Sequence, residues 1–147
     1  MASTTERVRQ SKDEHGVEHI IINTTITGGI KTTPEHRIHN DKWGEEYSDP
    51  IFGKSRSRHR RVKISALKED DLVEGLLKNG WTDDVVEADE LIDGIVESLN
   101  YGWVLRLTCG FENVNGERRF VRRMIVRKED QVRSSRMVFD CAGPLPF

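Results

Sequence analysis

The chain has 147 residues, which suits a single domain, and its formal net charge is -2. Charged residues make up 33% of the sequence, and their near-neutral balance argues against a protein that coats nucleic acid. No apolar run reaches membrane-spanning length and the polar N-terminus has no signal-peptide pattern, so we expect a cytoplasmic protein without a membrane partner. The two cysteines lack metal-ligand spacing, so the sequence predicts no disulfide, metal or cofactor.

The first third of the chain predicts an arm followed by two strands. Residues 1–16 are polar and aperiodic, which is typical of a flexible N-terminal arm. Residues 17–27 are rich in Ile and Thr and predict a strand, and a weaker strand over 30–38 is interrupted by Pro34. His36 and His39 are three residues apart, which places them on opposite faces of a strand and argues against a shared metal.

A loop with aromatic anchors, residues 40–53, leads into a basic strand over 54–67. Alternation puts Arg58 and Arg60 on the same face as Val62, which we interpret as an inward face ending in a basic rim. The same run, residues 54–63, has the composition of a nuclear-import or nucleic-acid-binding patch.

The next segment predicts helices. Leucine and valine at helical spacing indicate a helix over residues 68–79, which Asn79-Gly80 ends. Thr82 is a candidate N-cap for a second helix, with two alternatives for its length. Either it runs to residue 99, or it stops near residue 90 and a strand follows over 91–99.

Residues 102–128 predict a long β-hairpin. Asn115-Gly116 lies between two alternating runs, and both residues tolerate the positive φ of a type I′ turn. This turn places Val114 opposite Glu117 and Cys109 opposite Arg122, and Glu112 opposite Arg119 as a cross-strand ion pair.

One face of this hairpin is apolar and the other, which carries Thr108, Arg119 and Arg123, is expected to face solvent. Arg122 is the exception on the apolar face. A buried guanidinium needs a partner, so we expect either an internal ion pair or contact with the acidic group of a ligand.

The remaining residues, 129–147, predict a C-terminal tail in which Met137, Val138 and Phe139 could add an edge strand. The fold class is therefore α+β and β-rich, with one domain over residues 17–128. We expect an antiparallel sheet that curls into a small barrel, with one or two helices inserted before the last hairpin.

The hairpin pattern resembles that of small fungal proteins of poorly described function. The shared residues are Gly102-Trp103, Gly110-Phe111-Glu112, Asn115-Gly116-Glu117-Arg118-Arg119-Phe120 and Arg122-Arg123. The resemblance implies a lipocalin-like barrel and a place in fungal secondary metabolism, and it implies no particular reaction.

Three functions are compatible with these patterns. The first is a barrel that holds an apolar small molecule with an acidic or carbonyl group, and its expected ligand-binding residues are Arg122, Arg60, Arg58, Trp103, Leu105, Leu107, Phe111, Phe120 and Met124. The second is a cofactor-independent isomerase, cyclase or dehydratase in the same cavity, with candidate catalytic residues Arg122, His19, His59 and Tyr47. The third is a basic module that binds nucleic acid or protein, and homodimerisation stays open in all three.

Overall fold

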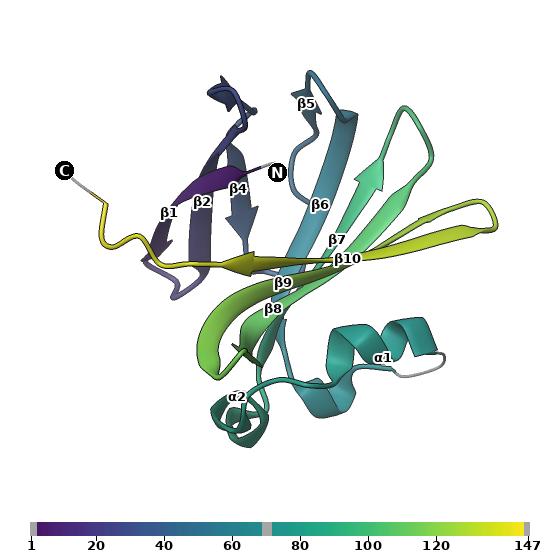
Figure 1. The fold of residues 1–147 in the computed structure, drawn as a ribbon. Coiled ribbons are helices and arrows are strands. Elements are labelled where there is room, and N and C mark those ends of the chain that lie inside the picture. The colour runs from purple at the N-terminus through teal and green to yellow at the C-terminus, as the bar shows by residue number, and fades with distance from the viewer. Residues whose placement is uncertain (1–2, 69–71, 146–147) are drawn as a thin grey trace.

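The computed structural model describes residues 3–68 and 72–145, and it gives no side-chain detail for residues 72–74. Its strands form two antiparallel sheets (Figure 1). The smaller sheet contains β1 (Thr4–Lys12), β2 (Glu18–Ile26), β3 (Ile30–Lys31) and β4 (Glu35–Ile38). The larger sheet has the order β10-β9-β8-β7-β6-β5 and contains β5 (Tyr47–Asp49), β6 (Gly53–Val62), β7 (Leu91–Ser98), β8 (Val104–Val114), β9 (Glu117–Lys128) and β10 (Gln131–Phe139).

The β-rich α+β class is confirmed. Within residues 3–68 and 72–145 the strands belong to two separate sheets, and the hydrogen bonds do not close them into the expected barrel. A 3₁₀ turn (Ile64–Ala66), α1 (Leu72–Lys78) and α2 (Asp83–Ala88) lie between β6 and β7. Figure 1 shows the helices on one side of the larger sheet and the smaller sheet on the other.

The predicted hairpin register is confirmed residue by residue. Val114 pairs with Glu117, and Cys109 pairs with Arg122. The turn residues Asn115 and Gly116 have φ values of 52° and 84°, as a type I′ turn requires. Of the two alternatives for the segment after Thr82, the short helix followed by a strand is correct.

Both termini differ from the sequence expectation. Residues 4–12 form β1, which pairs with β2 along its whole length, where we expected a flexible arm. Residues 131–139 form β10, a full edge strand rather than a tail. Side chains of both strands are mostly exposed and polar, so backbone pairing holds them in place without an apolar pattern in the sequence.

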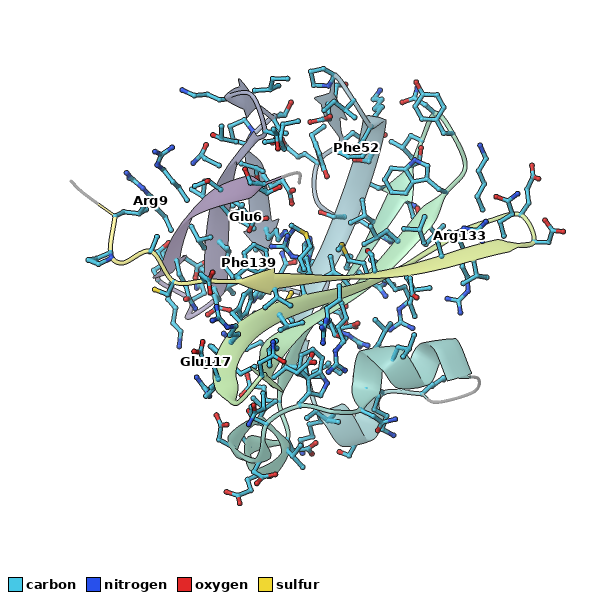
Figure 2. All side chains as sticks on the ribbon, in the orientation of Figure 1. Glu6, Arg9, Phe52, Glu117, Arg133 and Phe139 are labelled. Atoms are coloured by element: carbon cyan, nitrogen blue, oxygen red, sulfur yellow. The ribbon has the colours of Figure 1, made fainter. Side chains whose placement is uncertain are left out.

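The larger sheet has two covered faces. We call the face that carries His59, Cys109 and Arg122 the inner face, because it lies toward the smaller sheet. Figure 2 shows Glu6 of β1 between the sheets, whereas Arg9 of the same strand projects away from the body. Glycine at position 94 leaves room for the His59 ring, since a Cβ there would lie 2.5 Å from its Nδ1.

The outer face carries Thr108, Val121 and Arg123, and the helices cover it. Thr108 and Val121 are both 0% exposed, and the Thr108 hydroxyl donates a hydrogen bond to the carbonyl of Leu77 in α1 (2.9 Å). The expectation that this face is solvated is therefore wrong. The main apolar core lies under the helices, and it comprises Val62, Leu67, Trp81, Val85, Leu91 and Val121.

Candidate functional site

Arg122, the residue singled out by the sequence, is bound to a carboxylate. Its Nη1 and Nη2 donate hydrogen bonds to the two carboxylate oxygens of Glu6 at 2.8 and 3.0 Å. The two side chains are only 9% and 8% exposed. Of the two alternatives for Arg122, the structure has the internal ion pair, and the pair joins the larger sheet to the smaller one.

The other predicted ligand-binding residues are divided between two faces. Backbone register puts Leu105, Leu107, Phe120 and Met124 on the same face as Arg122, and Met124 also lines the cleft described below. Arg58 and Arg60 lie on the opposite face, because His59 between them points inward. Trp103 is half-buried just before β8, and Phe111 packs against the core under the helices.

The basic strand is largely neutralised by carboxylates. Arg60 pairs with Asp93 (2.9 Å), and Arg58 lies 3.3 Å from Asp41. Arg56 donates two hydrogen bonds to Glu97 and stacks on Trp43. These pairs reduce the positive charge available to a polyanion, so they do not favour the nucleic-acid interpretation.

The candidate catalytic residues do not share one site. His19 lies on the far face of the smaller sheet, where its ring nitrogens contact Asp13 and His36, each at 2.9 Å. Tyr47 is on β5, and burial raises the pKa of its hydroxyl. His59 shares the inner face with Arg122, and its ring nitrogens have no hydrogen-bond partner among the described residues.

His59 is held neutral by its surroundings. Burial, followed by the nearby positive charges of Arg37, His39 and Arg122, lowers its pKa to about 3. Glu18 on β2 is also buried; burial raises the pKa of its carboxyl, but the hydrogen bonds from Arg61 and Gln10 outweigh it and lower the pKa. No group of three or more potential metal ligands occurs in the described residues.

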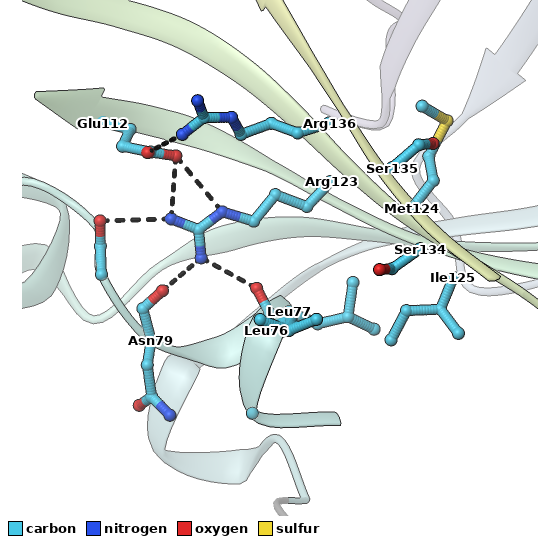
Figure 3. Close-up of a pocket in the computed structure, with 12 residues that line it drawn as sticks. Leu76, Leu77, Asn79, Glu112, Arg123, Met124, Ile125, Ser134, Ser135 and Arg136 are labelled. Atoms are coloured by element: carbon cyan, nitrogen blue, oxygen red, sulfur yellow. Dashed lines mark hydrogen bonds and ion pairs between the residues drawn. The ribbon is translucent and has the colours of Figure 1, made fainter. Parts of the chain in front are cut away.

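A cleft of about 490 Å³ lies on the outer face, between α1 and the strands β9 and β10. Its wall and floor are apolar: Leu76 is half exposed, whereas Leu77 and Ile125 are 2% and 1% exposed. Ser134 and Ser135 of β10 form the opposite side (Figure 3). The sequence does not reveal this cleft, because the polar side chains on this face of the hairpin indicate a solvated surface.

Three charged side chains close one end of the cleft: Glu112, Arg123 and Arg136. The Glu112 carboxylate accepts hydrogen bonds from both guanidiniums (Figure 3). This arrangement replaces the expected pair between Glu112 and Arg119. Arg123 and Glu112 are only 12% and 13% exposed, while Arg136 is 48% exposed at the rim.

Arg123 also fixes the position of α1. Its guanidinium donates to the carbonyls of Leu76 (2.9 Å), Asn79 and Gly80 (3.2 Å), where the helix ends. It lies 3.8 Å from the centre of the Trp81 ring. A cation at the C-terminus of a helix satisfies carbonyls that have no partner within the helix, so Arg123 holds one wall of the cleft in place.

The chain is similar to a curated fungal protein. A protein of Mollisia scopiformis described as a probable pericyclase is 28% identical to it over 131 residues, which is 88% of this chain and 65% of that protein. The chain thus spans about two thirds of the length of the curated relative that it matches. No protein-family model matches the chain, and no solved structure matches it significantly. No described helix has the length and apolar character that a membrane crossing requires.

Proposed function

We propose that this protein is an enzyme of the isomerase or cyclase type that binds an apolar small molecule in the cleft between α1 and β10. The observation that carries the proposal is the cleft itself, with apolar walls and a charged cluster at one end. Small-molecule sites typically have this size and this mixture of apolar lining and a few placed polar groups. The similarity to a probable pericyclase of Mollisia scopiformis supports the reaction class.

The cleft residues have separate tasks in this proposal. Leu76, Leu77 and Ile125 hold the carbon chain in a folded conformation that brings its reacting ends together. Arg136 donates hydrogen bonds to a polar group of the substrate and fixes the position of that group relative to the apolar walls. A pericyclic step redistributes bonds within one molecule, so the reaction balances without a second reactant.

The inner face is the alternative position for the ligand, and the ligand-binding role of Arg122 stays a prediction. The outer cleft is favoured because Glu6 already occupies both terminal nitrogens of the Arg122 guanidinium. Arg136 is more exposed, and only its Nη1 contacts Glu112.

The test is the cyclisation of a linear trienone, in which a short alkyl tether joins a diene to an enone. We expect Arg136→Gln to lower the rate acceleration about tenfold, because the charged donor that positions the polar group of the substrate is lost. Product formation is followed by chromatography.

Arg133→Gln is the matched control, since Arg133 lies on the same strand with opposite orientation. It should keep the full rate. A wild-type protein that does not accelerate the reaction, or an Arg136→Gln variant as fast as wild type, contradicts the proposal.

A further inference from the structure

Among the described residues, the Nε and Nη2 atoms of Arg136, at the polar end of the cleft, have no hydrogen-bond partner. We propose that the molecule bound in the cleft carries a carboxylate, or a planar anion of similar shape, and that Arg136 binds it through Nε and Nη2. This inference rests on the proposed function and specifies the chemical class of the substrate.

Arg123 is not available for this role. Its Nε and Nη2 bind Glu112 at 3.3 and 2.9 Å, and its terminal nitrogens also bind the helix-end carbonyls. One ring face of Trp81 covers the guanidinium. Binding a ligand here would break contacts that hold α1, so Arg123 acts as part of the wall.

Unlike Arg123, Arg136 is bound through only part of its guanidinium. Its contact with Glu112 is made through Nη1, and among the described residues no partner is bound to Nε or Nη2. Nε and Nη2 form one edge of the planar guanidinium, and this edge can donate two parallel hydrogen bonds to a carboxylate. Other arginines among the described residues use this edge, for example where Arg56 binds Glu97 and Arg37 binds Glu35, with nitrogen–oxygen distances of 2.8–3.0 Å.

The charge of the cluster favours an anion over a neutral carbonyl. Glu112 contributes one negative charge between the two positive charges of Arg123 and Arg136, which leaves the group with one excess positive charge. A carboxylate neutralises this excess and accepts two charge-assisted hydrogen bonds, which are about twice as strong as neutral ones. Ser134, which shares the face of Arg136 and lines the cleft, supplies a further hydroxyl donor.

The experiment compares trans-parinaric acid, a fluorescent polyene carboxylic acid, with its methyl ester. The tails are identical, so any difference in affinity comes from the charged group. We expect the acid to bind at least about tenfold more tightly in a fluorescence titration. Arg136→Gln should remove the preference, and Arg133→Gln should retain it.

Two outcomes overturn the inference. One is equal affinity of acid and ester for the wild-type protein, and the other is an acid preference that survives in Arg136→Gln. A Ser134→Trp variant, which fills the cleft, tests separately whether the cleft is the ligand site at all, and this is the claim on which the proposed function depends. If it binds both probes as wild type does, the ligand site is elsewhere and the proposed function fails, whereas loss of both confirms the cleft.

Discussion

Arg122→Leu lowers the free energy of unfolding by about 3–5 kcal/mol, because it leaves the Glu6 carboxylate buried without its counter-ion. Both side chains are more than nine-tenths buried, and two hydrogen bonds join them. Burial disfavours the charge on Arg122, but the bonds to Glu6 outweigh it and raise the pKa of the guanidinium. Urea denaturation followed by circular dichroism measures the loss.

Two comparisons identify the ion pair as the cause. Combining Arg122→Leu with Glu6→Leu removes both charges and should recover most of the lost stability. Arg118→Leu breaks the pair between Arg118 and Asp84, whose side chains are 52% and 57% exposed, and should cost less than about 1 kcal/mol. An Arg122→Leu protein as stable as wild type would show that the pair does not hold the two sheets together.

The free energy of unfolding falls by about 2 kcal/mol between pH 7 and pH 5 through His59 alone. Its pKa is 6.5 unperturbed and about 3 in the folded protein. The unfolded chain therefore binds a proton as the pH falls below 6.5, whereas the folded protein binds it only near pH 3. Stability is thus lost from the upper value down to the lower one.

Urea denaturation at a series of pH values measures this loss. His59→Leu should flatten the profile over that range, although His39, whose pKa burial also lowers, contributes a remaining slope in the same direction. His15→Ala is the matched histidine substitution outside the interior, because His15 is exposed in the turn between β1 and β2. A His59→Leu profile as steep as that of wild type would contradict the account.

The sequence predicts those elements whose signal is local. Asn115-Gly116 determines the turn, and the turn determines the pairing of every residue along β8 and β9. The sequence also predicts that the helix ends at Asn79-Gly80. In the structure α1 ends at Lys78, and Gly80 has the positive φ of 86° that is typical of a residue after a helix. Such features depend on a few neighbouring residues, so a single sequence contains them.

The site depends on contacts that the sequence does not display. Thr108, Glu112 and Arg123 have the polar pattern of a solvated face, yet α1 covers them. Their polar groups are satisfied by helix carbonyls and by one another, which permits burial of a polar face. The alternation within each strand leaves open which of its faces meets Arg122, and only the pairing of β6 through β7 to β8 shows that Arg58 and Arg60 point the other way.

A crystal structure of the protein with trans-parinaric acid shows where an apolar acid binds. We expect electron density for the polyene between α1 and β10, over Leu77 and Ile125, with the carboxylate at Arg136. Density for the ligand between the two sheets, with Arg122 released from Glu6, would contradict this expectation and would place the binding site on the inner face.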